Sequence, residues 1–344
     1  MLKSKTLLIV GAGASCEADL PIGIDLMPAI LSSIRIESRD FGPAKMEEDL
    51  RRALHSQELV RNRHINNEIH HYARAYTQMR EGLKLSISID NYLDAHQGDY
   101  YLQVLGKMGI VRSILKAESQ SKLSVTDHDS CDVSRVSDKW YAELFKMINE
   151  GVPRSSLDLF FSNLEVISFN YDRCIEHFFE RALRSYYSVD NEQATQAVSR
   201  LVVYHPYGQV GLLPWQNQHQ ATPFGSDKIG GSELVRLASR IKTFTERQDD
   251  QTQIERMREA VQSAETIVFL GFAFHPQNLE LIAPTKPAKA KRVFASAFGM
   301  SAPDIESTRD DIWEWLQGAD SRVEIAPLTC SKLFSEYRRS IPRA

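Results

Sequence analysis

The fold class follows from one segment near the start of the chain, Leu7-Leu8-Ile9-Val10-Gly11-Ala12-Gly13-Ala14-Ser15. Its first four residues are all apolar, which is typical of a strand buried on both faces of a parallel sheet. The two glycines that follow permit a tight turn and let backbone N–H groups approach a diphosphate closely. The sixth position of the dinucleotide-binding fingerprint is Cys16 instead of Gly or Ala, so a tight turn without a ligand remains the alternative.

Similar apolar runs recur in the second half of the chain, and helical patterns such as Cys174–Tyr186 and Glu255–Ala264 separate most of them. Strands that alternate with helices predict an α/β fold, a Rossmann-like doubly wound parallel sheet with right-handed crossovers. The predicted strands after the first are Val166–Phe169, Leu201–Tyr204, Thr266–Leu270, Arg292–Ala295 and Val323–Ile325.

A long segment between the first strand and the second has helical periodicity instead. We therefore expect a large helical insertion over residues 25–153, and a sheet domain made of residues 1–24 and 154–344. Within the insertion the pattern predicts helices over Met46–Met79, from a Ser88 cap through Leu93, and over Tyr101–Leu115. The Ser/Asp-rich stretch Ser119–Ser137 has no periodicity and is expected to be a loop.

Composition excludes several classes of protein. The net charge is −4 and no Lys/Arg block dominates any stretch, so no nucleic-acid-binding face is evident. No apolar run reaches the ~18–20 residues that span a bilayer. The four cysteines are far apart and form no C-x-x-C pair, which argues against a zinc ribbon and a disulfide scaffold and favours a reduced, cytoplasmic protein. His64, Glu68 and His71 share one helix face, which favours a solvated surface over a metal site.

Polar residues or a glycine follow three of the later strands, at the edge of the sheet where ligands of open α/β folds bind. Asn170 can donate and accept hydrogen bonds, and Asp172 can accept them, although Asp172 could simply cap the next helix. His205 could be a base or could contact a ribose hydroxyl, although a single loop histidine is more often structural. Gly271-Phe272 could lie against a ring or a ribose, or could be a buried strand turning into a helix.

In this order the motifs resemble the sirtuin superfamily: a G-A-G-x-S turn, a loop containing Pro21, an N-x-D strand end, a histidine and an apolar strand ending in Gly. Phe169-Asn170-Tyr171-Asp172 is similar to the sirtuin-like NADases of bacterial anti-phage systems, among them the Thoeris effector and the partners of HerA-like ATPases. Ser88-Ile89-Asp90-Asn91-Tyr92-Leu93 is also similar to a segment of those proteins. The chain lacks a four-cysteine zinc module and the Phe-Arg pair after Pro21, so a peptide deacetylase is disfavoured and no zinc is expected.

The resemblance implies that NAD is the substrate and that its nicotinamide–ribose bond is cleaved to give nicotinamide and ADP-ribose. Asn170 would position the ribose and the attacking water, His205 would orient a ribose hydroxyl or act as base, and Asp172 would bind the nicotinamide carboxamide. The expected nucleotide-binding residues, besides Asp172, are Gly11, Ala12, Gly13 and Ser15 at the diphosphate, together with Pro21, Gly271 and Phe272.

The resemblance also implies an effector that depletes NAD in anti-phage defence, a homo-oligomer, and a partner such as a HerA-like ATPase. A second reading is a non-catalytic sensor or scaffold that binds NAD or ADP-ribose in the same pocket. A third, an NAD-dependent oxidoreductase, lacks an acidic ribose-binding residue after a second strand and a matching glycine fingerprint.

Overall fold

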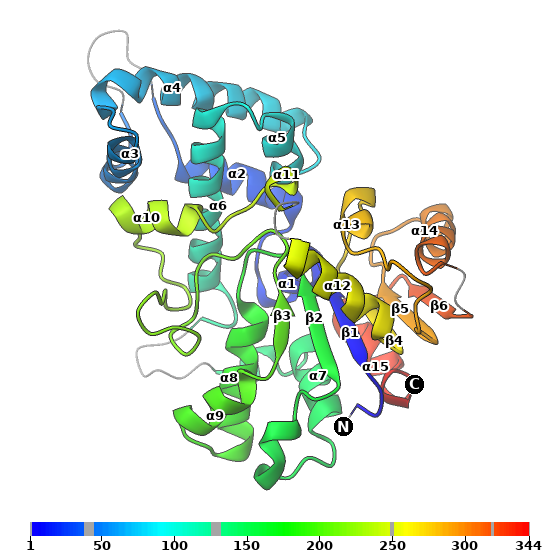
Figure 1. The fold of residues 1–344 in the computed structure, drawn as a ribbon. Coiled ribbons are helices and arrows are strands. Elements are labelled where there is room, and N and C mark those ends of the chain that lie inside the picture. The colour runs from blue at the N-terminus through cyan, green and yellow to red at the C-terminus, as the bar shows by residue number, and fades with distance from the viewer. Residues whose placement is uncertain (1, 38–44, 125–131, 248–250, 318–319, 344) are drawn as a thin grey trace.

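Six parallel strands form the centre of the protein in the computed structural model, which describes residues 2–37, 45–124, 132–247, 251–317 and 320–343 (Figure 1). Their order across the sheet is β3-β2-β1-β4-β5-β6, the order of a Rossmann fold, and this confirms the predicted fold class. The strands are β1 (Thr6–Val10), β2 (Leu164–Ser168), β3 (Val202–Tyr204), β4 (Thr266–Leu270), β5 (Arg292–Ser296) and β6 (Arg322–Ala326).

The register of the sheet places three strand ends side by side. Val10 at the end of β1 pairs with Ser168 of β2 on one side and with Leu270 of β4 on the other. The strand order reverses direction between β1 and β4, and a ligand of an open α/β sheet binds in the crevice at this point. The loops that follow β1, β2 and β4 therefore start at one level, on the edge where the sequence motifs were predicted to meet.

Each face of the sheet is covered by helices because both sets of alternating side chains are apolar. Leu7 and Ile9 of β1 point into one hydrophobic core, and Leu8 and Val10 point into the other. The first core includes residues of α12 (Gln251–Ser263), α13 (Pro276–Leu281) and α14 (Ala302–Trp315). The second includes residues of α7 (Trp140–Asn149), α8 (Cys174–Tyr187), α9 (Asn191–Val198) and α15 (Cys330–Glu336).

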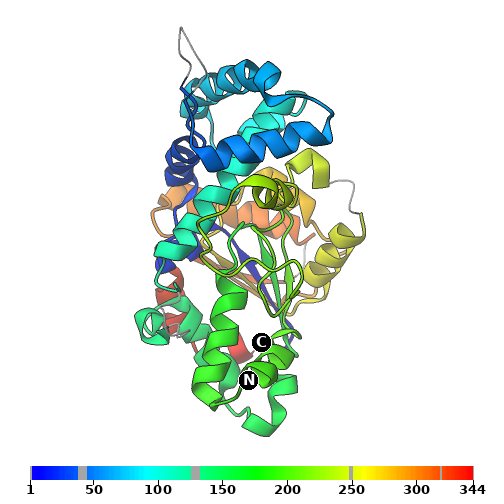
Figure 2. The ribbon, with the colours of Figure 1, turned by 90° about the vertical axis from the view of Figure 1, so that its left-hand side faces the viewer.

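Five helices of the predicted insertion, α2 to α6, gather at one end of the molecule, away from both termini (Figures 1 and 2). Ser88 caps α5 as predicted, by accepting a hydrogen bond from the Asn91 backbone. The longest helix, α6, packs against α2 through Gly109, where an added Cβ would lie 2.6 Å from the Ile30 side chain. The insertion helices are α2 (Gly23–Ser33), α3 (Glu48–Val60), α4 (Ile65–Gly82), α5 (Ile89–Ala95) and α6 (Tyr100–Gln120).

Packing crosses the predicted boundary at residue 153 in both directions. Helix α7 lies inside the predicted insertion in sequence, yet its Trp140 is fully buried in the core of the second sheet face. Conversely α10 (Gly231–Ala238), from the second half of the chain, packs against α3 and α6. The division into residues 25–153 and the remainder stays a prediction. The other short helices are α1 (Ala12–Ser15), α11 (Phe244–Arg247), and the 3-10 turns η1 (Cys16–Ala18), η2 (Leu83–Leu85), η3 (Val133–Val136), η4 (Arg154–Leu159) and η5 (Ile341–Arg343).

Two local predictions need adjustment. The stretch Ser119–Ser137 begins inside α6 and contains η3, and its residues 125–131 lie outside the described residues. On α4, Glu68 is only 5% exposed, so the helix face it shares with His71 is not wholly solvated. The Glu68 carboxylate instead accepts hydrogen bonds from Arg63 and Tyr101.

In the ranges that the structure describes, none of the helices combines the length and the apolar character needed to cross a bilayer.

Candidate functional site

The glycines after β1 and β4 allow two backbone segments to touch. Gly13 donates its N–H to the Gly271 carbonyl at 3.0 Å, and Gly11 donates to the Leu270 carbonyl at 3.0 Å. Gly271 has a φ of +53°, and a Cβ on it would lie 2.1 Å from the backbone nitrogen of Ala14. No side chain fits at such a distance, so the turn after β1 and the loop after β4 form one unit. Close packing alone thus accounts for glycine at these positions.

This packing limits which backbone groups could meet a diphosphate. The N–H groups of Gly11 and Gly13 are used within the protein, and Ala14 donates to the Gly11 carbonyl at 3.0 Å. Ala12 and Gly13 are nevertheless half-buried, so the turn reaches the surface. A diphosphate bound here would need donors other than the Gly11 and Gly13 amides.

Asn170 lies in the loop between β2 and α8 and is fixed against the glycine turn. Its Nδ2 donates to the Gly11 carbonyl at 3.0 Å and to Ser15 Oγ at 2.9 Å. The residue is only 7% exposed. Because the carbonyl of Gly11 can only accept, the side-chain nitrogen must face it and Oδ1 must point away. Among the described residues no donor reaches Asn170 Oδ1, which leaves it as an acceptor for a ligand or water.

Asp172 links the same turn to the start of α8. Its Oδ2 accepts a hydrogen bond from Ser15 Oγ at 2.7 Å, and its Oδ1 accepts one from the Cys174 N–H at 3.1 Å. Burial raises the pKa of Asp172 above its ordinary value, although these hydrogen bonds oppose the shift. Asp172 therefore does contact the first turn of the helix, as the capping alternative required, and it also orients Ser15 toward Asn170.

His205 follows β3 and lies behind Asn170, with 8% of its side chain exposed. Its Nδ1 lies 3.1 Å from the Asn170 carbonyl oxygen and its Nε2 lies 2.8 Å from Glu176 Oε1. Both partners are acceptors, and the ring can donate to both of them only as an imidazolium ion. Burial alone would lower the pKa of His205, but the Glu176 carboxylate and the Asn170 carbonyl outweigh it and raise the pKa above 6.5.

The structure brings most of the predicted residues together. The backbone of Phe272 lies beside Gly11, where an added Cβ would meet the Phe272 Cα at 2.8 Å, while the Phe272 ring packs on Phe169 with centroids 5.2 Å apart. The Gly271 N–H donates to Ser296 Oγ at 2.8 Å. Pro21 lies between η1 and α2, and none of the described hydrogen bonds joins it to the others.

Three features of the site were missed by the sequence analysis. Glu176, in the first turn of α8, pairs with His205, and Trp140 of α7 donates from Nε1 to the Ala14 carbonyl at 2.9 Å. Phe274 adopts a φ of +54°, a strained conformation for a bulky residue, in the loop after β4. The position of Glu176 four residues after Asp172 was the one available signal, since both follow the same strand.

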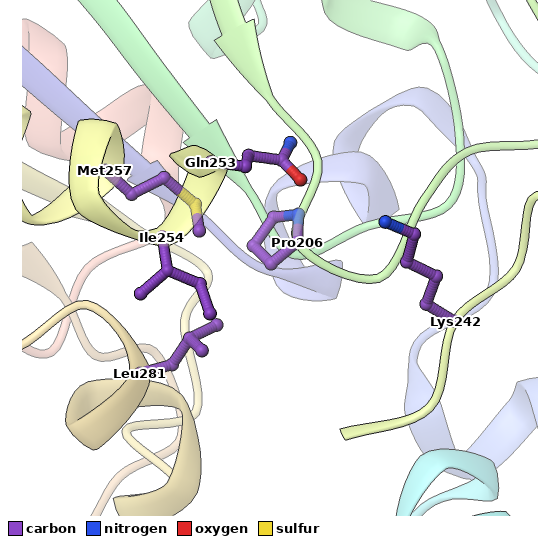
Figure 3. A pocket seen from close by; sticks show the side chains of 6 residues that line it. All are labelled: Pro206, Lys242, Gln253, Ile254, Met257 and Leu281. Atoms are coloured by element: carbon purple, nitrogen blue, oxygen red, sulfur yellow. The ribbon is translucent and has the colours of Figure 1, made fainter. Parts of the chain in front are cut away.

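A hollow lies beside Pro206, the residue after His205 (Figure 3). Pro206 faces the apolar side chains of α12 and α13 there, and Lys242 lies on its other side. The hollow is too narrow to admit a water molecule. It therefore has no room for a substrate.

No metal centre is evident at this edge. In the described parts of the chain, no three His, Cys, Asp or Glu side chains are grouped so that they could bind a metal ion. The polar groups that meet at the site are an amide, a hydroxyl, two carboxylates and an imidazolium. These groups can orient a polar ligand and a water molecule.

A protein-family model matches part of the chain. Residues 164–309 match the family model described as SIR2-like domain. The match begins at β2 and reaches α14, so it contains Asn170, His205 and Gly271 but neither the glycine turn after β1 nor the insertion helices. It supports a sirtuin-like relationship and an NAD-related function, because SIR2-like proteins are NAD-dependent enzymes. No curated protein matches the chain.

Proposed function

We propose that this protein is an NAD glycohydrolase that cleaves the nicotinamide–ribose bond to give nicotinamide and ADP-ribose. One observation supports it above the others: the Asn170 amide is fixed between Gly11 and Ser15 at the switch point of the sheet, with Oδ1 left available. The SIR2-like match over residues 164–309 makes NAD the expected ligand of that edge.

Cleavage of the nicotinamide–ribose bond requires little acid–base catalysis. The nicotinamide of NAD is positively charged and leaves as a neutral molecule, so the enzyme must orient the ring, stabilise an oxocarbenium-like ribose and deliver water. Asn170 Oδ1 would accept a hydrogen bond from a ribose hydroxyl or from the attacking water. Ser15 and Asp172 fix the plane of the Asn170 amide from the other side. Binding of the nicotinamide carboxamide by Asp172 would have to share an oxygen that already accepts a hydrogen bond.

In this geometry the role of His205 differs from that of a general base with a free ring nitrogen. Its two nitrogens are both engaged, one with the backbone of Asn170 and one with Glu176. We infer that the imidazolium positions Asn170 by binding its carbonyl. To act as base, His205 would have to leave the Glu176 carboxylate.

The resemblance to anti-phage NADases also implies a biological role for this activity. The protein would deplete NAD on infection, and it would be restrained in healthy cells through oligomerisation or through a partner such as a HerA-like ATPase. The second candidate is a sensor or scaffold that binds NAD or ADP-ribose without cleaving it. His205 Nε2 is already bound to Glu176. If ligand binding does not free a proton acceptor, this arrangement favours the sensor or scaffold.

The test is release of nicotinamide from NAD by the full chain, alone and with candidate partners, followed by chromatography of the products. Asn170→Ala should reduce turnover by about 10²–10³-fold, the loss typical of one positioning or transition-state contact. Its folding should be unchanged by circular dichroism. Asn66→Ala, on the exposed surface of α4, makes the same change away from the site and should leave turnover unaltered. Full turnover by Asn170→Ala would refute the role assigned to Asn170. Tight binding of NAD by the unaltered protein without product would establish the sensor.

A further inference from the structure

Successive side chains of the loop between β2 and α8 point alternately to two different parts of the molecule. Asn170 and Asp172 reach the glycine turn after β1. Tyr171 and Arg173 instead reach the helices of the insertion. Residues 170–173 of this loop therefore contact the candidate site and the insertion at the same time.

Tyr171 contacts the segment Ser88–Leu93, which the sequence analysis singled out. Its hydroxyl donates a hydrogen bond to Asp90 Oδ1, in the first turn of α5. Tyr171 is only 5% exposed, and its backbone carbonyl accepts a hydrogen bond from Val210 at 3.0 Å. Asp90 is half-buried. Because Asp90 lies near solvent, a movement of α5 could break its hydrogen bond with Tyr171.

Arg173 makes a second contact, which is entirely buried. Its Nε lies 3.1 Å from Glu118 Oε1 near the end of α6, and its backbone N–H donates to the same oxygen at 3.1 Å. Both side chains are 0% exposed. The guanidinium also donates to the carbonyls of Thr222 and Pro223. A buried pair that is so fully hydrogen-bonded fixes its two segments relative to each other.

We propose that Asp90 of the insertion is a positioning residue for Asn170: by binding Tyr171 it sets the conformation of the loop 170–173, and the insertion thereby controls the rate of the reaction. The buried ion pair of Glu118 and Arg173 holds one end of this loop in place. The hydrogen bond between Asp90 and Tyr171 is the contact that can form or break. The proposal rests on the proposed NAD-cleaving function for its kinetic readout. Neither Asp90 nor Tyr171 needs to touch the substrate.

The experiment compares Tyr171→Phe, Asp90→Ala and Asp90→Asn in the full chain. Tyr171→Phe and Asp90→Ala should each lower kcat about tenfold with little change in KM, since each removes one hydrogen bond to a charged group. Asp90→Asn keeps an oxygen that accepts from Tyr171 and should retain most of the activity. The double variant should be no slower than the single ones, because both changes remove the same contact.

Tyr100→Phe is the matched control. It deletes a tyrosine hydroxyl that donates to Glu58 inside the insertion, without touching the loop 170–173. Its kcat should equal that of the unaltered protein. Equal kcat in Tyr171→Phe and Tyr100→Phe, or loss of activity in Asp90→Asn as large as in Asp90→Ala, would overturn the proposal.

Hydrogen–deuterium exchange separates this proposal from the proposed function. In Asp90→Ala and Tyr171→Phe, amides of residues 169–176 should exchange faster than in the unaltered protein, and those of β1 should not. If the unaltered protein releases no nicotinamide, either alone or with candidate partners, while this change in exchange is seen, NAD cleavage is refuted and the positioning contact stands. Unchanged exchange at 169–176 overturns the positioning contact whatever the activity.

Discussion

The loops on the two sides of β1 reach the same crevice by different means. The loop 170–173 after β2 is fixed by side-chain hydrogen bonds and a buried ion pair. The loop 271–275 after β4 is fixed by backbone contact at Gly271 and by packing of aromatic rings such as Phe272 and Phe274, whose centroids lie 5.3 Å apart. The first loop can thus respond to charge and pH, whereas the second depends on the absence of a side chain.

The largest effect should follow from breaking the second loop. In Gly271→Ala the new Cβ would lie 2.1 Å from the Ala14 nitrogen, so the turn after β1 must move. We expect the free energy of unfolding to fall by more than about 4 kcal/mol, the range reached only by severe steric or core changes. Urea unfolding followed by circular dichroism measures this loss.

Gly299 is the matched control for that substitution. It also has a positive φ, +81°, but an added Cβ would meet nothing within 4 Å. Gly299→Ala should cost only the conformational strain of about 1–2 kcal/mol. If the two variants lost the same stability, close approach would not explain Gly271.

The next largest effect should come from the buried ion pair of the first loop. Arg173→Met leaves the Glu118 carboxylate buried without its partner, which should lower the free energy of unfolding by about 3–5 kcal/mol. Arg52→Ala removes an exposed pair with Glu48 on α3 and should cost at most about 0.5 kcal/mol. Equal losses in the two variants would contradict a structural role for Arg173.

The smallest predicted effect is the pH dependence of stability and activity. It is also the most specific test of the mechanism. Below the raised pKa of His205 the charged ring binds both Asn170 and Glu176, whereas a neutral ring can donate to only one of them. The stability contributed by this pair is therefore complete below pH 6.5, the ordinary pKa, and is lost as the pH rises through the raised value. If the imidazolium positions Asn170, kcat/KM falls over the same range.

A pH–rate profile distinguishes this role from that of a base, which would give the opposite slope because a base works in its neutral form. In Glu176→Gln the carboxylate that raises the pKa of His205 is gone, so the decline in kcat/KM should move to lower pH. A profile that rises with pH in the unaltered protein would assign His205 as the base.

The sequence predicted the sheet because buried parallel strands need continuous apolar runs, and all six runs became strands. It also predicted where Asn170, His205 and Gly271 lie, since residues that follow parallel strands share one edge. It did not predict that Glu118 is fully buried beside Arg173 or that Trp140 of α7 packs beneath the sheet. Those contacts join elements far apart in the chain, and no local pattern encodes which charged residue will find a buried partner.

The most direct measurement is the structure of Asn170→Ala with intact NAD bound. The account predicts that the dinucleotide lies across the carboxyl ends of β1, β2 and β4, with the nicotinamide ribose next to residue 170 and the remainder over the unit that Gly11–Ser15 and Gly271 form. NAD bound elsewhere on the molecule, or no NAD bound at millimolar concentration, would contradict it.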